Sequence, residues 1–157
     1  MDIYFDGVFY CKADAKGRVM LPVALRNQLA PVINEGFRIK RSYYDDCLEL
    51  YPVQEWDSVQ KELNATSRFD RKHLKFVRQF TAGLRQVEID DTGRLSIPKD
   101  IIALAGITKE VVLASMGKYI EIWDRAKYDE SLLATDEEKE ELANEVMLRG
   151  KNQGDVS

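Results

Sequence analysis

The chain has 157 residues, 45 % of them hydrophobic and 32 % charged, which is enough apolar mass for one or two small folded domains and excludes a disordered tail. No stretch approaches the roughly 20 apolar residues that span a bilayer, and the N-terminus carries neither a basic leader nor an apolar signal core, so we expect a cytoplasmic protein with no membrane partner. The formal net charge of −4 does not exclude a nucleic-acid partner, because the acidity is concentrated in residues 124–157, which carry −5, whereas residues 61–85 carry +5.

Residues 9–51 show the pattern of two strand pairs separated by a short helix. Apolar and polar residues alternate on both sides of the glycine-containing stretch 14–18, which predicts a β-hairpin. Pro22 then opens the helical segment VALRNQLA, because proline is tolerated in the first turn of a helix. A second pair of strands is predicted at 37–41 and 47–51.

Two amphipathic helices are predicted within residues 54–84. The second has a stripe of aromatic residues on one side and a basic face on the other, formed by Arg71, Lys75 and Arg78. Such a basic face is most often simply solvated, and contact with DNA is the alternative interpretation.

The pattern of the first segment then returns. Alternating residues flank the stretch 90–94, Pro98 opens a second short helix that ends near Gly106, and strands are predicted at 110–114 and 119–123. After them, Thr135 followed by Glu138 has the form of a capping box. We therefore expect an acidic helix there, whose apolar stripe is Leu142, Val146 and Met147.

A nine-residue motif is the clearest evidence of duplication. DAKGRVMLP at 14–22 and DDTGRLSIP at 90–98 share Asp, Gly, Arg and Pro at an offset of 76. A unit of about 45 residues is too small to hold a core alone, so the two copies should bury their apolar faces against each other as an internal pseudo-dimer, with both Gly-Arg turns at one edge. The predicted fold is α+β and mainly β. The predicted domains are two repeats at 7–54 and 83–126, a helical linker at 55–82, and an acidic helix with its tail at 127–157.

The chemistry of D-x-x-G-R suggests what the turn does. An aspartate at the start of a turn accepts backbone N–H bonds, glycine supplies a positive φ, and the arginine then emerges from a stiff backbone. A planar, always charged guanidinium suits forked recognition of phosphate or of guanine O6 and N7. The alternative is structural, with Asp14 pairing with Arg18 only to staple its own hairpin.

D-x-x-G-R followed by apolar-x-apolar-Pro and a short helix resembles the SpoVT/AbrB-like swapped-hairpin DNA-binding module, and DDTGRLSIPKDIIALAGI matches its course closely. Two such copies joined by a helical segment, with LELYP and IEIWD closing them, resemble the MraZ family of bacterial transcriptional regulators, over roughly residues 3–128. This resemblance implies a duplicated double-psi or swapped-hairpin β-barrel. It also implies a nucleoid-associated, ring-shaped homo-oligomer that binds double-stranded DNA at short direct repeats upstream of its own division and cell-wall operon.

The same resemblance implies roles for individual residues. The expected DNA-binding residues are Arg18, Arg94, Lys16 and Arg26, and the expected turn-organising residues are Asp14, Gly17, Asp90 and Gly93. Arg26 has Ile102 as its counterpart in the second copy, and Lys16 has Thr92. The first copy is therefore expected to contact DNA more strongly than the second.

Other functions have less support in the sequence. No nucleophile motif and no phosphate-binding glycine loop is present, so we expect no enzyme, no cofactor and no small-molecule substrate. Cys11 and Cys47 lack any C-x-x-C spacing and the chain has one histidine, so we expect small buried or half-buried cysteines and no metal site. An AbrB-like antitoxin or another protein-interaction module, with the acidic C-terminal segment as its contact, and a purely structural ring remain as alternatives.

Overall fold

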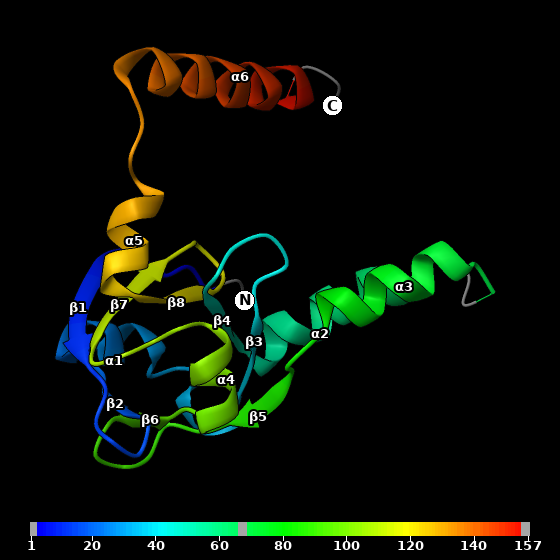
Figure 1. Cartoon of the computed structure of the whole chain (residues 1–157). Coiled ribbons are helices and arrows are strands. Elements are labelled where there is room, and N and C mark those ends of the chain that lie inside the picture. The colour runs from blue at the N-terminus through cyan, green and yellow to red at the C-terminus, as the bar shows by residue number, and fades with distance from the viewer. Residues whose placement is uncertain (1–2, 66–68, 155–157) are drawn as a thin grey trace.

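An antiparallel six-stranded sheet lies at the centre of the computed structural model, which describes residues 3–65 and 69–154 (Figure 1). The strands are β1 Val8–Lys12, β2 Arg18–Met20, β3 Phe37–Arg41, β4 Leu48–Pro52, β5 Arg85–Val87, β6 Arg94–Ser96, β7 Glu110–Ser115 and β8 Ile120–Asp124. The order in the sheet is β1-β7-β8-β4-β3-β5, and β2 and β6 pair with each other in a separate two-stranded ribbon.

Helices contain more residues than strands, so the α+β class is confirmed but the prediction of a mainly β fold is wrong. Much of the helical content comes from the segments that follow each copy, which the repeat pattern does not include. The helices are α1 Val23–Leu29, the 3₁₀ turn η1 Ile33–Glu35, α2 Val53–Asn64, α3 Arg71–Phe80, α4 Lys99–Leu104, α5 Arg125–Ser131 and α6 Asp136–Gly154.

The implied β-barrel is not closed within the described residues. The sheet is open, with β1 and β5 as its two edges. The strands β2 and β6 that could bridge these edges have three residues each and are soon followed by a proline that turns the chain into a helix. They pair with each other instead, as a short ribbon.

The two copies of the repeat build one sheet together. Strands β1, β3 and β4 come from the first copy and β5, β7 and β8 from the second, and β1 pairs with β7, β8 with β4, and β3 with β5. The registers relate the copies by an approximate twofold axis, because Glu49 pairs with its counterpart Glu121, and Val19 with its counterpart Leu95. The predicted internal pseudo-dimer is confirmed.

The apolar core lies between the inner face of the sheet, the ribbon and the short helices α1 and α4. Val19, Leu25, Leu95 and Ile101 have no exposed surface and belong to one cluster with the inner residues of the sheet. Each such side chain contributes roughly 1.5–3 kcal/mol by its removal from water. Because this one cluster combines residues from both copies, neither copy has a separate core of its own.

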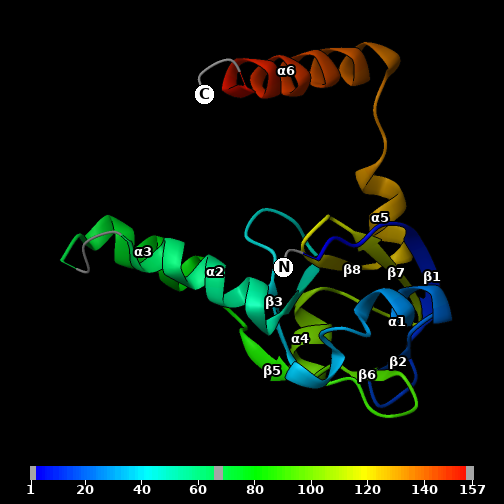
Figure 2. The same cartoon turned by 180° about the vertical axis from the view of Figure 1, so that it is seen from behind.

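Two helical arms leave the sheet. Helices α2 and α3 form one arm, and α6 stands apart from the rest of the chain at the end of an extended segment (Figures 1 and 2). The predicted cap of α6 is confirmed, since the Thr135 hydroxyl accepts the backbone N–H of Glu138 at 3.1 Å. None of the helices formed by described residues has the length and apolar character needed to cross a bilayer.

Candidate nucleic-acid interface

The first turn is organised by one carboxylate. Oδ1 of Asp14 accepts the backbone N–H groups of Lys16 and Arg18, both at 2.9 Å, and the Gly17 N–H donates to the Asp14 carbonyl at 3.0 Å. Gly17 has a φ of +81°, a conformation that other residues rarely adopt. The backbone N–H of Arg18, followed by its side chain, lowers the pKa of Asp14.

The second turn repeats this geometry. Oδ1 of Asp90 accepts the backbone N–H groups of Thr92 at 3.0 Å and Arg94 at 2.9 Å, and Gly93 has a φ of +86°. The Thr92 hydroxyl also donates to Asp90, at 2.7 Å. With the Arg94 N–H as the largest cause and the Thr92 hydroxyl next, the pKa of Asp90 falls to about 2.

Each turn holds its arginine by one nitrogen only. Nε of Arg18 lies 2.7 Å from Oδ2 of Asp14, and Nε of Arg94 lies 3.1 Å from Oδ2 of Asp90. The arginine side chains remain 36 % and 37 % exposed. The pairing foreseen in the structural alternative is therefore present, yet the terminal nitrogens of both guanidinium groups have no ion-pair partner in residues 3–65 and 69–154.

The two turns lie side by side. The Leu21 N–H donates to the Gly93 carbonyl at 3.0 Å, and the Ile97 N–H donates to the Gly17 carbonyl at 2.9 Å, so each turn is bonded to the end of the other copy's ribbon strand. Both turns project at the end of the molecule opposite α6 (Figures 1 and 2). The prediction that both Gly-Arg turns meet at one edge is confirmed.

Arg26 occupies a place that its sequence position does not indicate. It follows the first turn along the chain, but its guanidinium packs against Gly93 of the second turn, where it leaves no room for a Cβ atom. The counterpart Ile102 packs against Gly17 in the same way. The charge of Arg26 is therefore added to the second turn, and only Lys16, which is exposed, still supports stronger DNA contact by the first turn.

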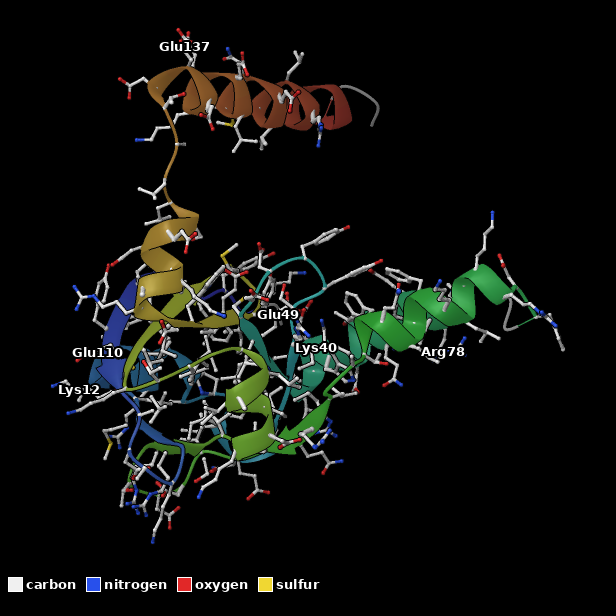
Figure 3. The ribbon with its side chains drawn as sticks, viewed as in Figure 1. Lys12, Lys40, Glu49, Arg78, Glu110 and Glu137 are labelled. Atoms are coloured by element: carbon white, nitrogen blue, oxygen red, sulfur yellow. The ribbon has the colours of Figure 1, made fainter. Side chains whose placement is uncertain are left out.

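Sequence reasoning missed a buried ion pair on the outer face of the sheet. Nζ of Lys40, a fully buried side chain, lies 2.9 Å from Oε1 of Glu49, and the Tyr51 hydroxyl donates to the same oxygen at 2.9 Å (Figure 3). The ring of Phe80 in α3 covers the ammonium group, 4.0 Å from ring centre to nitrogen. The available signal was opposite charges on facing strands of one hairpin, where Lys40 and Glu49 are in register.

The cysteines agree with the expectation of small buried residues. Cys47 is fully buried, Cys11 is half-buried, and both are free thiols. Burial raises the pKa of Cys11 to about 11, so its thiol is not a reactive thiolate at neutral pH. Within the described parts of the chain, no group of three or more His, Cys, Asp or Glu residues is placed to hold a metal ion.

Comparison with known proteins gives the same family along almost the whole chain. The family profile described as "MraZ protein, putative antitoxin-like" matches twice, at residues 4–79 and 80–150. The chain is 50 % identical to "Transcriptional regulator MraZ" of Christiangramia forsetii, over 90 % of this chain and 91 % of that protein. It is 47 % identical to the protein of the same name in Flavobacterium psychrophilum, over 90 % of both, and 34 % identical to that of Phocaeicola vulgatus, over 94 % and 96 %. The family is one of regulators and not of enzymes, and regulation of transcription implies DNA binding. The chain belongs to the MraZ family of transcriptional regulators.

Proposed function

We propose that the protein binds double-stranded DNA through its two D-x-x-G-R turns, at short direct repeats upstream of its own division and cell-wall operon. The observation that supports this most strongly is the pairing of β2 with β6, which brings Arg18 and Arg94 to one end of the molecule. Each aspartate fixes its arginine by Nε and leaves the planar fork of terminal nitrogens for a phosphate or for guanine O6 and N7. Lys16 and Arg26 supply further positive charge beside the two turns.

Assembly into a ring would make this contact useful. One protomer offers few phosphate-neutralising groups, and non-specific binding with such contacts is typically about 10⁻⁴ to 10⁻⁶ M at physiological salt. Several protomers that engage adjacent repeats turn later contacts into intramolecular ones, and avidity then rises by roughly 10² to 10⁴. A ring-shaped homo-oligomer is therefore part of the proposal.

The test is a fluorescence-anisotropy titration at several salt concentrations, with duplex DNA from upstream of the gene. The variants are Arg18→Ala, Arg94→Ala and the double mutant, and each lost base contact should cost about 1–3 kcal/mol of binding free energy. Each lost phosphate contact should also reduce the salt slope by about 1. If the double mutant kept the wild-type affinity, with the oligomer intact by light scattering, the two arginines would serve only to stabilise their own turns.

Arg78→Ala is the matched control. It removes an exposed arginine from α3, on the arm that projects away from the turns (Figure 3). As long as light scattering shows that this variant keeps the wild-type oligomer, we expect its DNA affinity to stay close to that of the wild type. A large loss of DNA affinity from this variant while its oligomer stays intact would favour the alternative interpretation, in which the basic face of α3 is a DNA surface.

The antitoxin or protein-interaction function has one observation in its favour. Four large apolar side chains of α6 are more than half exposed, namely Leu142, Val146, Met147 and Leu148. A helix of this kind can contact another protein chain. If the wild type bound no DNA from the region upstream of its gene, that function would replace the proposal.

A further inference from the structure

Helix α6 has a surface that its own chain does not cover. The exposed fractions of Leu142, Val146 and Met147 are 62 %, 53 % and 74 %, although an amphipathic helix normally buries its apolar stripe. The first part of α6 is also strongly acidic. The residues from Asp136 to Glu145 contain six acidic side chains and one lysine.

Helix α3 carries the opposite charge. It has four basic residues and no acidic one, and the basic residues are Arg71, Lys72, Lys75 and Arg78. All four are exposed, and none forms an ion pair with another residue of the described chain. Most arginines of the central fold, by contrast, have a carboxylate partner, as Arg18, Arg41, Arg85 and Arg94 do.

An aromatic patch lies on the other side of α3, away from the basic face defined above. Phe76 of α3 is 38 % exposed, and the loop between β3 and β4 brings Tyr44, 91 % exposed, close to it through Tyr43. Tyr43 stacks on Tyr44 with 4.8 Å between ring centres and lies 5.2 Å from Phe76. The arm therefore offers charge on one side of α3 and apolar contact area on the other, and the charged side is the one that complements an acidic helix.

We propose that α6 of one protomer docks on α3 of a neighbouring copy, with Glu137, Glu141 and Glu145 facing Arg71, Lys75 and Arg78. The three acids are spaced four residues apart and the three bases four and three apart, so each set forms one stripe along its helix. Parallel packing of α6 against a second α6 would instead bring two acidic stripes together. The partner that fits α6 by charge is the basic helix of another copy.

The two surfaces also explain how a closed assembly can arise. Each protomer carries both helices of the contact, α6 on one arm and α3 on the other. Glu137 lies on the side of α6 turned away from its own sheet, where a neighbouring copy can reach it (Figure 3). A contact between two different surfaces is heterologous, and it generates a ring when the rotation closes. This inference rests on the ring in the proposed function and names the contact that holds it, without involving the DNA-binding turns.

The test is a charge-swap experiment on the full chain, with mass measured by light scattering. The first variant reverses α6, as Glu137→Lys, Glu141→Lys and Glu145→Lys, and the second reverses α3, as Arg71→Glu, Lys75→Glu and Arg78→Glu. Each variant alone should fall to a mass several-fold below that of the wild-type assembly. An equimolar mixture should recover the large assembly, because each reversed helix then meets a complementary helix on the other variant.

Recovery in the mixture separates this contact from misfolding and from docking of α6 on its own α3, neither of which mixing can repair. The matched control, Glu88→Lys with Glu110→Lys and Glu130→Lys, changes the net charge equally at exposed sites outside α6 and should keep the wild-type mass. If both reversed variants kept the mass of the wild-type assembly, or if they stayed small when mixed, the docking of α6 on α3 would be overturned. The ring in the proposed function would not be affected by either result. A monomeric wild type would overturn the ring and the docking together, while the anisotropy titration still decides whether the turns bind DNA.

Discussion

At the scale of single residues, Asp14 and Asp90 hold the candidate interface together although both are exposed to solvent. Each carboxylate accepts two backbone N–H groups with one oxygen and pairs with an arginine through the other. Such a residue acts on the turn and on the arginine at the same time. It is a positioning residue for DNA contact as well as a structural one.

The ionisation of Asp90 should be visible in the pH dependence of stability. Its pKa is lowered from 3.8 to about 2 in the folded state, so the ionised carboxylate stabilises the fold above about pH 4. This contribution is lost as the pH falls toward 2. Because asparagine cannot ionise, the difference in urea midpoint between wild type and Asp90→Asn should shrink between about pH 5 and pH 2.5.

Asp91→Asn provides the control for this measurement. Asp91 is the neighbouring aspartate, and within the described chain it accepts none of the hydrogen bonds that organise the turn. It should follow the wild type at every pH. A gap between Asp90→Asn and the wild type that stays constant down to pH 2.5 would show that ionisation of Asp90 does not stabilise the fold.

At the scale of elements, the ribbon of β2 and β6 depends on a close approach at Gly17. A Cβ atom there would lie 2.6 Å from the carbonyl oxygen of Ile97, the residue that follows β6 in the other copy. Gly17→Ala should therefore cost ~1–2 kcal/mol for the positive φ, and about 1–3 kcal/mol more for the contact with backbone that cannot move freely. The measurement is the free energy of unfolding in urea.

Gly117→Ala is the matched control, because Gly117 has a similar backbone conformation but enough space where the new Cβ atom would lie. Gly117 has a φ of +86°, close to that of Gly17, but its nearest neighbour for a Cβ atom is Tyr4 Cδ1 at 3.9 Å. It should show the conformational cost alone. Equal losses in the two variants would mean that the approach of the two copies at Gly17 does not restrict the residue.

Local patterns were sufficient to predict most elements and both turns, because alternation, proline and D-x-x-G-R act within a few residues. They also predicted the pairs β3–β4 and β7–β8 correctly. The hairpin expected around each turn is wrong, because only one isolated bridge joins the two flanks of a turn, and β1 pairs with β7 and β2 with β6, far apart in the chain. The position of Arg26 against Gly93 depends on the pairing of β2 with β6 and was missed for the same reason. Lys40 was missed because a lysine on the outer face of a strand is normally solvated, whereas here Phe80 covers it.

At the scale of the whole molecule, the shared sheet makes the two copies one folding unit. Three of the five strand pairs in the sheet, and the pair in the ribbon, join strands from different copies, and the core combines side chains from both. Two independent domains would unfold in two steps, each with its own midpoint. A sheet built by both copies should unfold in one transition, because removing either copy exposes the core of the other.

The two tryptophans allow this to be tested from both copies at once. Trp56 follows the first copy in α2 and Trp123 lies in β8 of the second, so Trp123→Phe and Trp56→Phe each leave one fluorescent reporter.

Leu25→Ala empties a fully buried position in α1 and should cost about 2–5 kcal/mol of unfolding free energy. Because the copies share one core, it should lower the urea midpoint seen by Trp123 as much as that seen by Trp56, and Ile101→Ala in α4 should act in the same way from the second copy. Leu142→Ala, at an exposed site of α6, should stay within about 0.5 kcal/mol of the parent when all samples have the same concentration. If Leu25→Ala moved the Trp56 transition and left the Trp123 transition in place, the copies would be separate domains that merely touch.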